Sequence, residues 1–334
     1  LSAAQAPSNG GASEFIAAPD SITIPELPAS AFADTSLYSD GKTLMEHARE
    51  FSGTAVVVLS RSAGEHADLD VRELQLTAEE IALLDSVCGS FDDVVLLLNC
   101  ANTLEVGFVR DYPQIKSVLW VGFPGESGNL AAAAILSGAV NPSGRTVDIY
   151  PADFSRDPAF VNFGDYRYSN ISRQNASGDG CFVQYEEGIY VGYRYYETRY
   201  EDRVLGQGNA GGYDYAATVQ FPFGYGLSYT RFAYSGFRAE REDGAYTVTV
   251  TVTNTGDVAG KEVVQVYAQK PYTDYDRRYG IEKASVELVG FEKTALLEPG
   301  GSETVTVTVG EERFKSYDAN NAKTFIIDEG VYLS

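Results

Sequence analysis

The sequence has 334 residues, of which 25 are basic and 47 acidic, so its formal net charge is −22. A surface this acidic repels the phosphates of nucleic acids and of anionic lipids, and we discount both as partners. The negative electrostatic potential of such a surface favours a neutral substrate over an anionic one. The length suggests about two domains, and a hydrophobic content of 44% is ample for a packed core.

The cysteines are few and odd in number: Cys88, Cys100 and Cys181. They form neither a disulfide framework nor a zinc-binding spacing, which favours a reducing compartment. The sequence contains no apolar stretch of membrane-spanning length and opens with no basic-then-apolar leader. We therefore predict a cytoplasmic rather than a secreted protein, while the start at Leu1 leaves room for a leader on a longer precursor.

The N-terminal region predicts an arm followed by the first regular elements. Residues 1–40 are rich in Ala, Ser, Pro and Gly without a period, which indicates an extended arm or linker. Thr43–Phe51 has a helical pattern, and Gly53 is placed to act as its C-cap. The apolar run Thr54–Leu59 then predicts a buried strand.

Helices and apolar strands alternate over the next hundred residues. Thr77 and Glu80 form a capping box, which predicts a helix that continues to Gly89. Two unbroken apolar runs predict strands buried on both faces. In chain order, the remaining predicted elements are the strand Asp93–Cys100, the strand Ser117–Phe123, the helix Leu130–Leu136 and the strand Arg145–Tyr150.

This alternation predicts a mainly parallel sheet with helices packed on it. In such sheets ligands bind beyond the carboxyl ends of the strands. Glu65, Asn99 and the Phe123–Glu126 turn all follow predicted strands, so we expect a site where they meet.

Residues 151–231 are irregular and rich in Tyr, Phe, Gly and Asn. Aromatic rings in loops can stack on the C–H faces of sugars. The simpler interpretation, which we favour, is that these aromatic side chains pack the long irregular segment 151–231 onto the sheet.

From Phe232 the pattern changes to strict alternation, as in Tyr246–Asn254 and Glu303–Val309. Short alternating strands separated by Gly and Asn turns indicate a β-sandwich. We therefore divide the chain into an arm at 1–40, an α/β sandwich domain at 41–231 that includes the aromatic excursion, and a β-sandwich at 232–334.

Several segments together resemble glycoside hydrolase family 3, the β-glucosidase-like retaining glycosidases. Each segment alone is weak evidence for the family, but together they occur in the order typical of it. The segments are Ser60–Glu65, Asn141–Gly144, Glu187–Tyr196, Phe221–Tyr229, Val289–Phe291 and Glu298–Gly300. The resemblance implies that the first domain is the α/β sandwich domain of the family and that the second is its fibronectin type III-like domain.

The resemblance also places the family's acid/base glutamate at Glu65, after Gly64. A retaining glycosidase needs one protonated carboxyl group that donates to the leaving oxygen and then acts as a base on water. The segment that follows, His66–Arg72, differs from the family pattern and is shortened.

Other polar residues around Glu65 are weaker candidates. Arg61 could bind a sugar hydroxyl or form an ion pair that supports the loop, and His66 could line the site. Asp68 and Asp70 could contact sugar hydroxyls, although charges in a loop are usually only solvated, and Glu126 is expected to be a turn residue. We predict no metal and no cofactor, and two histidines leave little room for a catalytic triad.

The second carboxylate of a retaining mechanism lies about 5 Å from the first. The resemblance implies that this Asp lies on a (β/α)8 barrel, which needs about 250 residues that this sequence does not contain. We therefore expect the barrel to be a partner, either later in the same chain, as in domain-rearranged members, or in a second chain. A glycoside is the expected substrate, and a homo-oligomer is possible. The alternative is a non-catalytic carbohydrate-binding or scaffolding module, for which the retained Gly64-Glu65 pair has no evident use.

Overall fold

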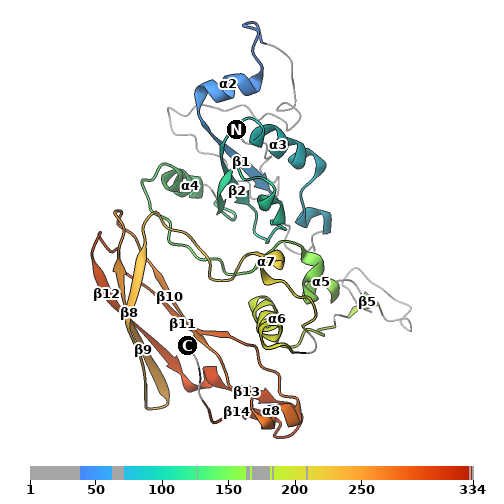
Figure 1. Ribbon diagram of the computed structural model, residues 1–334, viewed down its shortest axis with the longest axis vertical. Helices are drawn as coiled ribbons and strands as arrows, with labels where there is room; N and C mark the ends of the chain where they lie inside the picture. The colour runs from blue at the N-terminus through green and yellow to red at the C-terminus, as the bar shows by residue number, and fades with distance from the viewer. Residues whose placement is uncertain are drawn as a thin grey trace. The chain divides into compact units, whose positions relative to one another are not determined.

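The computed structural model describes residues 38–61, 71–125, 127–162, 166–167, 181–182, 184–207, 210–330 and 332 (Figure 1). The described residues form two compact units, which are treated separately below. The first comprises the residues up to Val140 together with Tyr150–Ala152, and the second comprises Asn141–Ile149 and the residues from Asp153 onward. The predicted domain boundaries at residues 40 and 231 stay predictions.

The first unit is built on a parallel sheet, as predicted. Its strands are β1 (Thr54–Ser60), β2 (Asp93–Asn99) and β3 (Ile115–Trp120), in the order β1-β2-β3. Both pairings are parallel, with Thr54 opposite Asp93 and Val95 opposite Ser117. After the exposed Asp93, the central strand β2 alternates buried residues with half-buried ones, because successive side chains point to opposite faces of the sheet.

The prediction of burial on both faces is wrong for β3. Ile115 is the buried residue of this strand, and Trp120 is half exposed. Among the described strands β3 lies at the sheet edge, so its apolar run is less covered than its composition suggests.

The helices of the first unit begin where side-chain caps predict them. α2 (Leu44–Phe51) and α3 (Ala78–Cys88) each begin with a complete capping box, formed by Thr43 with Glu46 and by Thr77 with Glu80. α3 packs against β1 and β2 and buries Leu83, Leu84, Val87 and Cys88, whereas Ile81 is exposed. The C-cap of α2 is Ser52 in an extended conformation, so the prediction of Gly53 for this role is wrong.

Shorter elements complete the first unit. They are η1 (Val71–Leu74), η2 (Gly107–Arg110), α4 (Gly128–Leu136) and β4 (Tyr150–Pro151). The strand predicted from Arg145 is therefore confirmed only at its last residue. Thr146, in the second unit, instead bonds to a loop: its N–H donates to Tyr225 O and its hydroxyl to Pro222 O.

The middle of the chain contains a helix that the sequence pattern did not predict. α6 (Tyr193–Leu205) belongs to the second unit, and Tyr196 is its buried residue. Around it lie short elements: η3 (Phe154–Arg156), α5 (Pro158–Asn162), β5 (Tyr166–Arg167), β6 (Cys181–Phe182), α7 (Tyr215–Thr218) and β7 (Val219–Phe221). The Tyr193 and Phe223 rings stack with centroids 4.4 Å apart, so aromatic residues of this segment pack on one another, while the predicted packing onto the sheet stays a prediction.

The rest of the second unit is the predicted β structure. One sheet has the order β12-β9-β8, a second pairs β10 with β11, and a third pairs β13 with β14 (Figure 1). The bounds are β8 (Phe232–Glu242), β9 (Ala245–Asn254), β10 (Val263–Ala268), α8 (Asp274–Tyr279), β11 (Glu287–Lys293), β12 (Ser302–Gly310), η4 (Glu311–Phe314), β13 (Ser316–Asp318) and β14 (Thr324–Ile326).

The Thr/Val alternation of β9 and β12 determines the two faces of their sheet. The valines, such as Val250 and Val307, are buried in a shared core with residues of β10 and β11. The intervening hydroxyl residues face outward and bond across the strands, as Thr251 does to Thr304 at 3.0 Å. A period of two thus separates a packed face from a solvated one.

Candidate active site

The candidate site lies at the carboxyl edge of the parallel sheet in the first unit. Because β1, β2 and β3 run in the same direction, the residues that follow them come together at this edge: Arg61, Cys100 and Val121. The Arg61 N–H donates to Asn99 O at 3.1 Å and so continues the pairing of β1 with β2 beyond the last strand residue.

The two central predicted residues fall outside the described part of the chain. Glu65 and His66 belong to residues 62–70, which connect Arg61 to η1 and for which the structure gives no description. Asp68, Asp70 and the turn residue Glu126 also lie outside the described residues. Their roles therefore stay predictions.

Arg61 is described, and all of its donors bond within the protein. Its Nη1 and Nη2 atoms form a bidentate ion pair with Glu80, at 2.6 and 2.8 Å. Its remaining N–H groups donate to the backbone carbonyls of Glu73 (2.7 Å), Ser60 (2.8 Å) and Gln75 (2.6 Å). A guanidinium has five N–H donors, so this side chain has none left over.

The structure therefore contains the ion pair that we considered as one of two roles for Arg61. The side chain is buried, at 8% exposed. A contact with a sugar hydroxyl would require it to give up one of these bonds, and such a contact stays a prediction.

The next strand contributes a buried thiol. Burial raises the pKa of Cys100 to about 11, and the positive charge of Arg61 only partly opposes this shift. The thiol is therefore protonated at neutral pH and is a poor nucleophile. The Trp120 Nε1 donates to the carbonyl of Cys100 at 2.7 Å, which links the ends of β2 and β3.

Two buried polar atoms at this edge lack a partner among the described residues. They are Ser60 Oγ, at the end of β1, and Asn102 Oδ1, in the segment after β2. No group of three or more His, Cys, Asp and Glu side chains with the geometry of a metal site occurs in the described part of the chain.

Sequence reasoning missed the second role of Glu80. It assigned this residue to the capping box of α3, and the carboxylate does accept the Thr77 N–H at 2.9 Å. The same Oε2 atom also accepts from Arg61, nineteen residues away. A local pattern contains no signal for such a pair.

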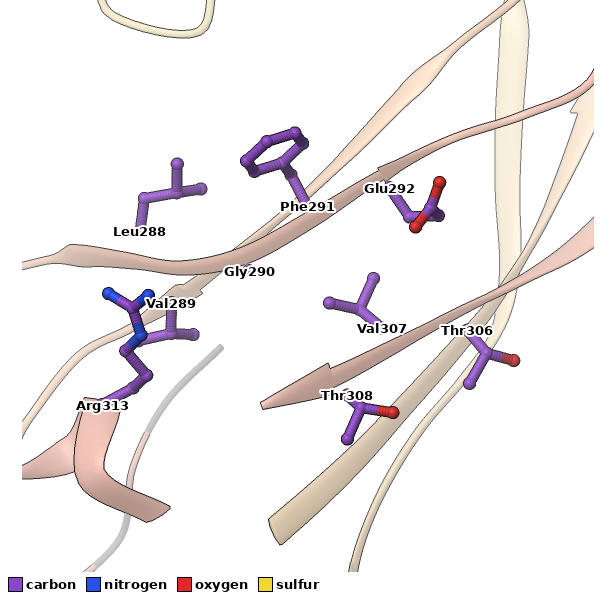
Figure 2. Close-up of a pocket in the computed structure, with 9 residues that line it drawn as sticks. All are labelled: Leu288, Val289, Gly290, Phe291, Glu292, Thr306, Val307, Thr308 and Arg313. Atoms are coloured by element: carbon purple, nitrogen blue, oxygen red, sulfur yellow. The ribbon is translucent and has the colours of Figure 1, made fainter. Parts of the chain in front are cut away.

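A groove of about 530 Å³ lies in the second unit, between β11 and β12 (Figure 2). Val307 projects from one side of β12, and Thr306 and Thr308 project from the other. The residues that line the groove are Leu288, Val289, Gly290, Phe291, Glu292, Thr306, Val307, Thr308 and Arg313. They include none of the predicted site residues.

Comparison with known proteins identifies the family to which this chain belongs. Residues 17–193 match the glycosyl hydrolase family 3 C-terminal domain, and residues 262–333 match the fibronectin type III-like domain. A parallel α/β domain followed by a fibronectin-like β domain is thus part of a glycoside hydrolase architecture. The chain belongs to glycosyl hydrolase family 3.

Among the curated relatives are β-glucosidases and exo-α-(1→6)-L-arabinopyranosidases, the latter from Bifidobacterium longum and Bifidobacterium breve. The chain is 35% identical over 297 residues to a β-glucosidase of Ruminococcus albus, a match that covers 87% of this chain and 27% of the relative. It is 32% identical over 340 residues to β-glucosidase A of Butyrivibrio fibrisolvens, covering 90% of this chain and 36% of the relative. The matches thus span between about a quarter and about a third of the length of these two relatives.

Solved structures agree with this assignment. A β-glucosidase from Paenibacillus barengoltzii superposes with a TM-score of 0.71 at 32% identity, covering 90% of this chain and 30% of that one. β-Glucosidase 3B from Thermotoga neapolitana, in complex with glucose, superposes with a TM-score of 0.70 at 30% identity. This match covers 96% of the present chain and 39% of the Thermotoga chain. The resemblance predicted from the sequence motifs is confirmed.

Proposed function

We propose that this chain is the acid/base part of a retaining β-glucosidase-like glycosidase, with Glu65 as the proton donor. The proposal is supported by the order of the chain: Glu65 follows β1 in the sequence, and the carboxyl end of β1 lies at the edge of a parallel sheet in a domain that matches family 3. Ligands of parallel sheets bind at this edge.

The proposed mechanism has two steps. In the first, the protonated Glu65 carboxyl donates its proton to the glycosidic oxygen while a nucleophilic carboxylate attacks the anomeric carbon, so that the aglycone leaves and a glycosyl-enzyme forms. In the second, the Glu65 carboxylate takes a proton from water, which attacks the same carbon and releases the sugar with retained configuration.

In this proposal the nucleophile lies outside the elements described here. In the first unit the described strands form a three-stranded parallel sheet, which is not a closed barrel. We propose that a (β/α)8 barrel, in the same or a second chain, supplies the second carboxylate and completes the enzyme. The proposal is supported by the share of the relatives that the chain spans, between 27% and 36% for the two curated relatives named above.

Leaving-group dependence tests the proposal. We expect Glu65→Gln, in the enzyme assembled with its barrel, to lower kcat/KM for phenyl β-glucoside by about 100-fold or more, because a poor leaving group needs the proton. The loss on dinitrophenyl β-glucoside should be much smaller in the glycosylation step, since this leaving group departs as an anion. The measurement is kcat/KM over a series of aryl β-glucosides.

Asp70→Asn is the matched control, because it removes a carboxylate from the same segment. This variant should not steepen the dependence of kcat/KM on the pKa of the leaving group. Wild-type rates of Glu65→Gln on poor leaving groups would contradict the proposal.

A second candidate function is carbohydrate binding without catalysis. Exposed rings in the second unit favour it: Tyr185 is 85% exposed and Tyr229 is 49% exposed. It predicts that this chain alone binds glucosides, which calorimetry at millimolar sugar would detect. Absence of binding heat would count against it.

A further inference from the structure

The side chain of Trp120 lies at the carboxyl edge of the parallel sheet in the first unit. Trp120 is the last residue of β3, and its Nε1 donates at 2.7 Å to the carbonyl of Cys100, the residue that follows β2. The indole therefore reaches from the end of one strand to the end of the next. Ligands of parallel sheets bind beyond this edge, so the ring lies where a ligand of the first unit is expected.

The orientation of the indole is fixed at two points. The hydrogen bond from Nε1 is the first. The second is the backbone of Gly122, which is buried and has a φ of +61°. A Cβ atom on Gly122 would lie 3.3 Å from Cζ2 of the Trp120 ring, so the missing side chain lets the backbone approach the indole closely. A ring held in this way loses little conformational entropy when it contacts a ligand.

The anchored ring is nevertheless half exposed, at 47%, and Phe123 in the turn after β3 is 50% exposed. Single exposed apolar side chains are normal on protein surfaces. Trp120 differs from them because its N–H is already bonded within the protein, so the exposed part of its side chain is apolar. A ligand that covers this ring should therefore have an apolar face of its own.

A pyranose ring has the chemistry that this surface fits. Its faces consist of C–H groups that pack on an aromatic ring, while its hydroxyls point outward to water or to protein. It is also neutral, which suits a chain with a formal net charge of −22. Residues 17–193, which include Trp120, match a glycosyl hydrolase domain.

We propose that Trp120 is a stacking platform for a pyranose ring of the glycoside. The inference rests on the proposed function only for the class of ligand, and it does not depend on the position of any residue of 62–70. Trp120 contributes binding and takes no part in proton transfer.

Fluorescence tests the proposal on the purified chain, because Trp120 is the single tryptophan of the sequence. Methyl β-glucoside should shift the emission to shorter wavelengths in a saturable way, at up to about 100 mM because a single platform binds weakly. The sugar should also lower the acrylamide quenching constant by about twofold, since it covers one of the two ring faces. Sorbitol at the same concentration is the control, because this acyclic polyol has no ring face. Equal responses to both compounds, or no response to either, would overturn the proposal.

Kinetics give a second readout, in the enzyme assembled with its barrel. Trp120→Ala should raise KM for phenyl β-glucoside by about tenfold and change kcat by less than about threefold, because stacking binds substrate and transition state alike. Trp120→Phe keeps a ring and loses the Nε1 donor, so its KM should lie between those of Trp120→Ala and the wild type. Phe51→Ala is the matched control: Phe51 is 93% exposed in the same unit but precedes the amino end of β1, so KM should not change.

The outcomes separate this inference from the proposed function. An unchanged KM for Trp120→Ala, or a fall in kcat alone, would overturn the platform and leave the role of Glu65 to its own leaving-group series. A flat leaving-group profile for Glu65→Gln would overturn the proposed function but not a fluorescence response of Trp120. The titration uses the unaltered chain, so it stays decisive if Trp120→Ala fails to fold.

Discussion

At the scale of single residues, buried charges in this chain are paired through several bonds at once. Arg61 in the first unit is one example, and Lys283 in the second is another. The Lys283 ammonium donates to Asp276 at 2.7 Å, to Asp328 at 2.6 Å and to Pro271 O at 2.8 Å. Asp276 is fully buried, and its Oδ1 has no partner among the described residues. Lys283 thus neutralises a carboxylate that has no access to solvent.

Lys283→Met should destabilise the second unit by about 3–5 kcal/mol, because it leaves a buried carboxylate without its cation. Urea unfolding of the purified chain measures the change in the free energy of unfolding. The control is Arg241→Met, which breaks the exposed pair of Arg241 with Glu311, whose side chains are 57% and 35% exposed. That pair should contribute less than about 1 kcal/mol. Equal effects of the two variants would contradict this account.

At the scale of elements, side-chain caps determine where helices and turns begin. The hairpin of β13 and β14 depends on Asp318 at the end of β13. Its carboxylate accepts the N–H groups of Asn320, Asn321 and Ala322, at 3.1, 2.8 and 2.9 Å, and the Tyr275 hydroxyl of α8 at 2.6 Å. One charged side chain thus organises the turn and ties it to a helix.

These bonds make the hairpin sensitive to acid. Burial by itself would raise the pKa of Asp318, but the hydrogen bonds from Tyr275 and the backbone outweigh it and lower the pKa from 3.8 to about 2. Because the folded-state pKa lies below the unfolded one, Asp318 stabilises the fold above pH 3.8, and this contribution is lost as the pH falls toward 2. Asp318→Asn should remove this part of the pH dependence.

Thermal unfolding of the chain and of the Asp318→Asn variant between neutral pH and about pH 2 checks this expectation. The difference in midpoint between the two proteins should be greatest at neutral pH and should shrink through the acidic window. A difference that stays constant with pH would show that the carboxylate charge does not matter.

Local patterns predicted most elements and missed those that depend on distant contacts. The capping boxes at Thr43 and Thr77, the parallel strands and the alternating valines of β9 all follow from spacing within a few residues. α6 was missed because its tyrosines and arginines have no clear apolar period, although packing against rings such as Phe223 stabilises it. The strand expected from Arg145 was lost because Thr146 bonds to residues near 225 instead.

The parallel sheet, and hence its carboxyl edge, could be predicted from the alternation of strands and helices. Glu65, which the family resemblance implies, stays a prediction, and the contacts of Arg61 at this edge could not be predicted. The pairing of Arg61 with Glu80 spans nineteen residues, and neither residue type signals the other in the sequence.

At the scale of the whole molecule, the chain matches only part of the length of its relatives. It belongs to family 3, and its matches cover 27% and 36% of the two curated β-glucosidases described above. In the described residues no helix is long and apolar enough to span a bilayer. The cytoplasmic location, the barrel partner and a homo-oligomer stay predictions.

The most direct test of the central claim is to trap the intermediate that Glu65 should resolve. In the enzyme assembled with its barrel, Glu65→Gln should still form the glycosyl-enzyme from dinitrophenyl β-glucoside, but it lacks the base that activates water. Azide is already anionic and needs no base, so adding it should raise turnover and yield β-glucosyl azide, identified by NMR. An unchanged rate in azide and glucose as the sole product would show that Glu65 is not the acid/base.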